Sequence, residues 1–318
     1  MDHKDASTME DAILSVLTGT PVGEAAPRAG VSPTRLAEMA DRYRSAGLAA
    51  LDTQPAGWQQ VNIEFADYPT AEHAFRDSLL PSLRTGPVGA WWFVRKYPCW
   101  RLRVQPDTDA RSEDTVRNIA EALDHAASRG VVERWWPSLY EPETVAFGGP
   151  YGMTLAHALF HTDSVGVLDY HQQATDGSGD LLGPKETSFL LITTLLRAAE
   201  LEGGEQGDIW GRVEASRPLP PDVPRNQIGR MAHPLRRLLT LDTDALLSDG
   251  PLTPLRTWFT DVRSTGRALG NAAHAGKLDL GLRSILARHI LFHWNRMGFT
   301  TRQQSIWARA AREAILGR

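Results

Sequence analysis

The run WWFVRKYPCWRLRV, residues 91–104, limits the fold more than any other part of the chain. It contains two segments rich in aromatic and β-branched residues, a composition that favours strands. Only a short break at Tyr97 and Pro98 separates the two segments, so the strands are expected to pair antiparallel as a hairpin. The alternating residues of VNIEF, 61–65, predict a further strand.

Most of the remaining chain has apolar residues three and four positions apart, as helices do. The segments expected to be helical are 112–128, 153–170, 185–202 and most of 227–318. YEPETVAFGG, residues 140–149, is expected to be a strand that enters a glycine turn, and the Gly- and Pro-rich stretches 172–184 and 216–227 are expected to be loops. Because strands come early and helices late, without βαβ alternation, the fold class is α+β, an antiparallel sheet followed by a largely helical C-terminal half.

Residues 1–55 are expected to form a small helical module, in which Ser32 caps a helix that has Pro33 in its first turn. The segment resembles a helix-turn-helix unit, which suggests DNA. It contains five basic and eight acidic residues, a net charge of −3. Because phosphate contacts supply most non-specific DNA affinity, a module that docks a peptide or protein is favoured over one that binds DNA. The linker TQPAG separates it from a second domain, 56–318.

Composition excludes several classes of protein. The chain has 318 residues, of which 42% are hydrophobic, with 34 basic against 38 acidic residues and a formal charge of −4. This charge gives no overall attraction to nucleic acid or to an anionic membrane. A single cysteine, Cys99, excludes an internal disulfide. No apolar run approaches the length that spans a bilayer, and the first residues lack a signal-peptide pattern, so we expect a cytoplasmic protein.

The stretch RHILFHWNRMGF, residues 288–299, carries a polar stripe on an apolar helix. His289, His293 and Arg296 lie at positions i, i+4 and i+7 and therefore share one face. A polar stripe between apolar flanks usually faces either a cleft or a buried partner. Both alternatives are open at the level of the sequence.

Two further groups could contact a substrate. Arg101 and Arg103 lie two apart on one expected strand, and two guanidiniums at this spacing can grip a carboxylate or phosphate, although an exposed sheet face with surface ion pairs is the simpler reading. His157 and His161 lie four apart on a helix. The zinc-protease pattern requires glutamate after the first histidine, and Ala158 occupies that position, so a polar stripe that includes His161 and faces substrate is favoured over a metal site.

The motifs WWFVRKYPCWRLRV, YEPETVAFGGPYGM, AHALFHTDS and LFHWNRMG occur in the order in which they occur in the C-terminal domain of lantibiotic dehydratases. Residues 58–318 resemble this domain, which is also found as a free-standing thiopeptide-type bacteriocin biosynthesis protein. The resemblance implies tailoring of a ribosomal precursor peptide. One chemistry is elimination of glutamate from glutamylated Ser or Thr to give dehydroalanine or dehydrobutyrine. The other is pyridine synthesis from two dehydroalanines with loss of the leader peptide.

The residues suit elimination, a lyase reaction that requires a base, donors for an enolate-like oxygen and cations for the departing glutamate. His293 is the expected base because imidazole exchanges protons near neutral pH. Arg101 and Arg103 match the arginines of the family's strand motif and are expected to anchor the glutamyl group. Asn295 and Arg296 are expected to donate to the carbonyl oxygen. No metal or other cofactor is expected.

One departure concerns the segment ETVAFGG, which begins at Glu143. Elimination domains of this family carry Glu, two residues and then Arg before Tyr-Gly-Gly, and here Ala146 replaces that arginine. Glu143 is retained and is an expected substrate contact. One possibility is that another cation, such as Arg95, Lys96 or Arg103, supplies the positive charge of the missing arginine. The other is that the function differs, and is either pyridine synthesis or non-catalytic binding of peptide or DNA.

The expected partners follow from the resemblance. They are a precursor peptide with a leader and a Ser/Thr-rich core, and a split dehydratase that transfers the glutamyl group. Neither nucleic acid nor a membrane is an expected partner, and the oligomeric state is open, a homodimer included.

Overall fold

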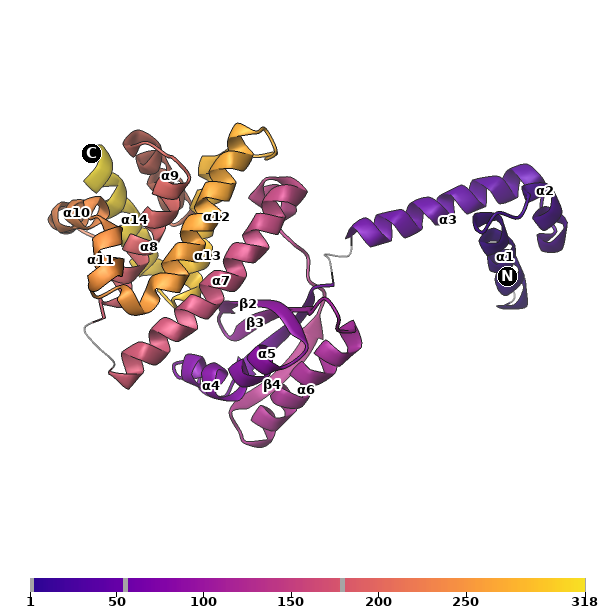
Figure 1. Ribbon diagram of the computed structural model, residues 1–318, viewed down its shortest axis with the longest axis horizontal. Coiled ribbons are helices and arrows are strands. Elements are labelled where there is room, and N and C mark those ends of the chain that lie inside the picture. The colour runs from indigo at the N-terminus through magenta and orange to yellow at the C-terminus, as the bar shows by residue number, and fades with distance from the viewer. Residues whose placement is uncertain (1–2, 54–56, 178–180, 318) are drawn as a thin grey trace. The chain divides into compact units, whose positions relative to one another are not determined.

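The computed structural model describes residues 3–53, 57–177 and 181–317. The chain divides into two compact units, Met1–Gly57 and Trp58–Arg318. Figure 1 shows the helices and strands of each unit. Of the TQPAG linker, residues 54–56 lie outside the described residues.

The N-terminal unit is a small set of helices, as its Pro- and Gly-interrupted sequence predicts. They are α1 (His3–Leu17), α2 (Val22–Ala25), the 3-10 helix η1 (Ala26–Ala29) and α3 (Pro33–Thr53). Ser32 Oγ accepts a hydrogen bond of 3.3 Å from the backbone N–H of Arg35, which confirms the expected helix start. Ile13 and Leu36 are buried together with four alanines, and partly buried side chains such as Val16 and Leu17 pack against them, so the core of this unit is small.

The second unit contains an antiparallel sheet in the order β2-β3-β1-β4. Its strands are β1 (Gln59–Phe65), β2 (Val88–Lys96), β3 (Cys99–Pro106) and β4 (Val132–Ser138). The hairpin and the first strand are confirmed. β4 is absent from the sequence-based predictions because only Val132 is buried along it, so it lacks the alternating apolar pattern of a half-buried strand.

The two faces of the sheet have opposite characters. On one face Trp100 and Phe93 pack against Phe75, whose ring centroid lies 5.3 Å from that of Trp100. Figure 1 shows the helices below this face, α4 (Ala71–Ser78), α5 (Leu80–Thr85) and α6 (Ser112–Ser128). α6 has the predicted bounds, whereas α4 and α5 were not predicted. On the other face Arg103 pairs across the strands with Trp92. The alternation therefore turns both strand arginines, Arg103 and Arg101, away from these helices.

Helix α7 (Gly149–Asp176) covers the exposed edge of β2. The backbone N–H of Phe93 donates to Ser164 Oγ at 3.2 Å, so a side chain of the helix satisfies a donor of the edge strand. The prediction of a loop from residue 172 is wrong for its first part, because α7 continues to Asp176, whose carboxylate oxygens both accept from Gln172 Nε2 one turn earlier. Of that predicted loop, residues 178–180 lie outside the described residues.

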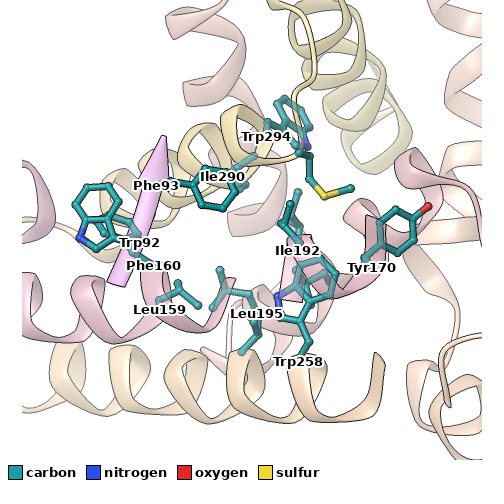
Figure 2. Packing of buried hydrophobic residues seen from close by; sticks show 14 of the residues in the cluster. Trp92, Phe93, Leu159, Phe160, Tyr170, Ile192, Leu195, Trp258, Ile290 and Trp294 are labelled. Atoms are coloured by element: carbon teal, nitrogen blue, oxygen red, sulfur yellow. The ribbon is translucent and has the colours of Figure 1, made fainter. Parts of the chain in front are cut away.

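The C-terminal half is helical, as predicted. It contains α8 (Pro184–Ala198), α9 (Gly203–Ser216), α10 (Arg225–Thr240), α11 (Thr243–Asp249), η3 (Thr253–Leu255), α12 (Arg256–His274), α13 (Leu282–Arg296) and α14 (Thr301–Leu316). Figure 2 shows side chains of β2, α7, α8, α12 and α13 that point into one shared core. Gly166 permits the close approach of α7 to α12, since a Cβ there would clash with the indole ring of Trp258.

The prediction of a strand at residues 140–149 is wrong. The residues before Thr144 have no regular structure, and η2 (Thr144–Phe147) is a 3-10 helix. Pro142 has no N–H to donate to a strand ladder. Gly148 and Gly149 have φ angles of +86° and +88°, a conformation that glycine adopts without strain, and they turn the chain directly into α7.

Candidate active site

A cleft of about 650 Å³ lies in the second unit, against the arginine-bearing face of the sheet. Its apolar lining consists of aromatic and aliphatic side chains, among them Trp92, Phe147, Met153, Phe160, Phe292 and Phe299. Its charged lining consists of the cations Arg95, Lys96, Arg101, Arg103 and Arg217 and the carboxylates Glu141 and Glu143. Among the described residues the cations outnumber the carboxylates, so the cleft favours an anionic ligand with apolar parts.

Arg103 is held in place by neutral groups. Its Nε donates to Gln60 Oε1 at 2.7 Å, and its guanidinium carbon lies 4.2 Å from the ring centroid of Trp92 and 5.5 Å from that of Tyr140. Burial lowers the pKa of Arg103 to about 10, so it stays charged at neutral pH. Its Nη1 has no hydrogen-bond partner within the described part of the chain. A fixed cation without a carboxylate partner has its charge available for a ligand.

Arg95 is a second such cation on the cleft wall. Its guanidinium carbon lies 4.6 Å from the ring centroid of Trp100, and burial lowers its pKa to about 10. Neither Nε nor Nη2 has a hydrogen-bond partner among residues 3–53, 57–177 and 181–317. Arg95 therefore has the same property as Arg103, a charge held by aromatic rings rather than by a carboxylate.

Tyr140 and His157 form a hydrogen-bonded pair beside Arg103. Tyr140 Oη lies 2.8 Å from His157 Nε2, and the imidazole packs on Trp58 with a distance of 4.7 Å between ring centroids. Burial, with the charge of Arg103, lowers the pKa of His157 to about 4, so the imidazole is neutral at neutral pH. Burial raises the pKa of Tyr140. The sequence-based reasoning missed Tyr140, for which the only signal was its place at the start of YEPETVAFGG.

Glu143 and Asn295, two expected substrate contacts, also line the cleft with Arg101 and Arg103. Glu143 is exposed, and its carboxylate accepts a hydrogen bond of 2.5 Å from Arg288 Nη1. Asn295 Oδ1 accepts from Gln304 Nε2 at 3.0 Å, which leaves its amide N–H groups available. Four of the sequence-predicted residues thus come together from three separate parts of the chain.

His293 and Arg296 lie elsewhere, in a buried network around Asp163. His293 Nδ1 donates to Asp163 Oδ1 at 2.9 Å, and Arg296 Nε donates to Oδ2 at 2.6 Å. The side chains of His293, Arg296 and Asp163 are 7%, 1% and 3% exposed. Of the two alternatives left open by the sequence, the polar stripe thus has a buried partner. The expected position of His293 and Arg296 on the wall of a substrate cleft is therefore corrected to a buried position. Their catalytic role stays a prediction.

This network joins four helices. Trp258 Nε1 of α12 donates to Asp163 of α7 at 3.2 Å, and Ser188 Oγ of α8 lies 2.9 Å from His293 Nε2 of α13. Trp294 Nε1 donates to Ser188 Oγ at 3.1 Å. Burial by itself raises the pKa of Asp163, but the charges of His293 and Arg296 outweigh it and hold the pKa well below its usual range. The carboxylate therefore stays ionised and paired inside the core.

His161 contacts the backbone of the edge strand β2. Its Nδ1 lies 2.9 Å from the backbone oxygen of Trp91 and 3.2 Å from the backbone nitrogen. It does not line the cleft. No group of three His, Cys, Asp or Glu residues in the described part of the chain could hold a metal ion.

A match to a family model assigns this chain to a protein family. Residues 58–315 match the family model described as lantibiotic biosynthesis dehydratase C-term. The chain belongs to this family. The match covers the whole sheet and nearly all of the helical half, the two parts that form the cleft. The resemblance inferred from the sequence motifs is thereby confirmed.

Three solved structures share the fold. The tRNA-dependent lantibiotic dehydratase MibB from Microbispora sp. 107891 is 17% identical with a TM-score of 0.62, and the alignment covers 83% of this chain but 28% of MibB. The pyridine synthase TbtD from thiomuracin biosynthesis is 15% identical with a TM-score of 0.58 over 82% of this chain and 98% of TbtD. TsrL is 18% identical with a TM-score of 0.53 over 82% of this chain and 95% of TsrL.

A comparison with curated proteins finds no significant match. Among the described helices, none is both long enough and apolar enough to cross a membrane. Membership of the lantibiotic dehydratase family therefore rests on the family model, and the solved structures add the fold.

Proposed function

We propose that this protein eliminates glutamate from glutamylated Ser or Thr residues of a ribosomal precursor peptide, a lyase reaction. The observation that carries the proposal is the cleft, in which Arg101 and Arg103 lie beside apolar walls and have no carboxylate partner among the described residues. Glutamate departs as a carboxylate, and free guanidiniums stabilise the charge that develops on it. The apolar walls suit the peptide and exclude water.

The other cleft residues have roles in the same reaction. Glu143 and Glu141 line the cleft, and we propose that they face the ammonium of the glutamyl group. The amide of Asn295 is placed to donate to a peptide carbonyl whose α-carbon loses its proton. Each role requires a group on the cleft wall, and all three residues are there.

The arginine missing at Ala146 has a candidate replacement. Arg95 is among the residues that line the cleft, and its Nε and Nη2 have no hydrogen-bond partner among the described residues. We propose that it supplies the third positive charge that the elimination members of the family place after Glu143. Lys96, on the same cleft wall, adds charge at the end of the strand.

We propose that a separate protein supplies the glutamyl group. This chain spans 28% of MibB, a whole tRNA-dependent dehydratase. We propose as partners a separate glutamyl-transferring protein and the precursor peptide. The acidic N-terminal unit, with its net charge of −3, is proposed to dock one of them.

Pyridine synthesis is the second candidate. The observation in its favour is Ala146, because the cleft lacks the arginine that elimination members of the family carry at that position. The aromatic walls formed by Trp92, Phe160 and Phe292 are compatible with two planar dehydroalanine units.

The two candidates differ in substrate and product. Purified protein is incubated without added metal or cofactor, in one reaction with a Ser-glutamylated precursor and in another with a precursor that contains two dehydroalanines. Elimination releases glutamate and leaves a peptide lighter by one water than the unmodified one, which mass spectrometry detects. If the glutamylated peptide persists while the second peptide is cyclised and loses its leader, pyridine synthesis replaces elimination.

A further inference from the structure

Elimination requires a proton acceptor within the cleft, and His293 is not on its wall. Apart from the cations, the titratable groups of the described lining are Tyr68, Tyr97, Tyr140, Glu141 and Glu143. Glu143 is already paired with Arg288. Of the three tyrosines, Tyr140 alone is hydrogen-bonded to a histidine in the part of the chain that the structure describes.

The surroundings hold the pair of Tyr140 and His157 in one arrangement. Tyr140 is 6% exposed, and its ring packs edge-on against Trp92 at 5.8 Å between centroids. His157 lies between the rings of Trp58 and Trp92. Because both rings are packed, the hydrogen bond of 2.8 Å between Tyr140 Oη and His157 Nε2 has a fixed geometry. A preorganised donor and acceptor reduce the reorganisation that proton transfer would otherwise require.

We propose that Tyr140 is the catalytic residue that accepts the α-proton and that His157 is a positioning residue that receives the phenol proton; this inference rests on the proposed elimination. The α-hydrogen moves as a proton to Tyr140 Oη while the phenol proton moves to His157 Nε2. The C–H electron pair becomes the Cα=Cβ bond. The Cβ–O bond breaks, its electrons leave with glutamate as a carboxylate, and His157 afterwards returns the proton to solvent.

Arg103 couples substrate binding to the strength of this base. Its positive charge contributes, after burial, to the lowered pKa of His157. A carboxylate bound to Arg103 neutralises that contribution and raises the affinity of His157 for a proton. Substrate binding thus removes the smaller of the two causes that lower the pKa of His157, while burial, the larger cause, remains.

The test uses the full chain and a pre-glutamylated peptide under single-turnover conditions. Tyr140→Phe keeps the ring and removes the hydroxyl, and His157→Gln keeps a hydrogen-bond acceptor that takes up no proton at neutral pH. Both variants should eliminate glutamate roughly 10²- to 10⁴-fold more slowly than wild type, the usual contribution of general base catalysis, with little change in peptide affinity. Tyr151→Phe, an exposed tyrosine outside the cleft lining, should react at the wild-type rate.

A peptide deuterated at the α-carbon distinguishes catalysis from structural support. In Tyr140→Phe the isotope effect on elimination should be at least as large as in wild type, because proton removal then limits the rate. Wild-type activity in Tyr140→Phe or His157→Gln would overturn the relay and leave elimination standing. A slower Tyr140→Phe whose defect lies only in peptide affinity, with no isotope effect, would overturn it as well. If wild type itself does not eliminate glutamate, both proposals fail.

Discussion

The cleft and the buried network around Asp163 both contain arginine, but the arginines have different partners. Arg296 donates to Asp163 and is 1% exposed, so its charge is compensated inside the core. Arg103 donates to the neutral side chain of Gln60 and lies over aromatic rings on the cleft wall. The partner, more than the residue type, therefore separates an arginine that holds helices together from one available to bind substrate.

The largest expected effect is a loss of stability when the charge of Asp163, at the centre of the buried network, is removed. Asp163→Asn leaves Arg296 buried without a carboxylate, and breaking such a pair costs about 3–5 kcal/mol. The free energy of unfolding, measured by urea titration, should fall by this amount. Asp169→Asn on the same helix is the matched control, because the side chain of Asp169 is 43% exposed and its pair with Arg84 contributes about 0–1 kcal/mol. Equal stability of the two variants would contradict a structural role for the network.

The next effect concerns His293, for which catalysis and core packing make opposite predictions. His293→Ala removes one buried hydrogen-bond partner from Asp163 and one from Ser188, so we expect a loss of about 1–3 kcal/mol in unfolding free energy. A catalytic His293 would instead lower elimination by roughly 10²- to 10⁴-fold with little change in stability. A thermal melt beside a single-turnover assay separates the two. Normal activity in a well-folded variant would remove His293 from the mechanism; His289→Ala, one turn earlier, serves as the comparison.

Arg103→Ala should lose activity and largely keep its stability, the reverse of what we expect for His293→Ala. A charge-assisted hydrogen bond is worth about 1.5–3 kcal/mol, so kcat/KM for a glutamylated peptide should fall roughly 10- to 100-fold. Steady-state kinetics on that peptide measures the loss. Arg84→Ala, an exposed arginine outside the cleft, should behave as wild type. A variant that melts far below wild type and yet binds the peptide normally would place Arg103 with the network instead.

A smaller effect is the dependence of stability on pH. Burial lowers the pKa of His289 to about 3, and burial together with nearby arginines lowers the pKa of His157 to about 4 and of His171 to about 3. In the unfolded chain histidine titrates near pH 6.5. The stability from burying these rings in the neutral form is therefore fully present above about pH 6.5 and is lost as the pH falls toward 4 and then 3.

His289→Leu tests this dependence because neither ring nitrogen of His289 has a hydrogen-bond partner among the described residues. Below pH 6.5 the variant should lose stability less steeply than wild type, by about 1 kcal/mol per pH unit. Urea titrations at pH 7.5, 6.5 and 5.5 measure the slopes. His274→Leu, at an exposed position, should keep the wild-type slope. Parallel slopes for wild type and His289→Leu would show that His289 is not buried as a neutral ring.

The smallest expected effect is that of deleting residues 1–57. The two units have separate hydrophobic cores, so the melting temperature of 58–318 should stay close to that of the whole chain. Association with the precursor peptide or the glutamyl-transferring partner should weaken, as a pull-down with each would show. Specific binding of the full chain to duplex DNA at physiological salt would overturn the docking role.

Local patterns predicted most of the elements correctly. The hairpin of β2 and β3 and the bounds of α6 follow from side-chain period and propensity, which act between neighbouring residues. β4 was missed because its side chains are mostly exposed, so it carries no apolar alternation. Residues 140–149 were assigned to a strand that enters a glycine turn, whereas Pro142 and the two glycines with positive φ make the segment a turn into α7.

The candidate site was predicted only in part. The alternation of β3 correctly placed Arg101 and Arg103 on one face, because side chains two apart on a strand point the same way. Helical spacing likewise placed His289, His293 and Arg296 on one face. Helical spacing does not say what lies opposite that face, and it was Asp163, more than 120 positions earlier in the chain, that placed the stripe in the core.

The sequence by itself determined the α+β class, the family and the arginine face of the sheet, because each depends on residue spacing and on motifs that are continuous in the chain. Only the tertiary structure decided which polar residues have a buried partner and which line the cleft. That distinction depends on contacts between α7, α8, α12 and α13, and on the meeting of Tyr140 with His157 beside Arg103. Burial changes the energy of a charge by far more than any local preference, and burial is a property of the assembled fold.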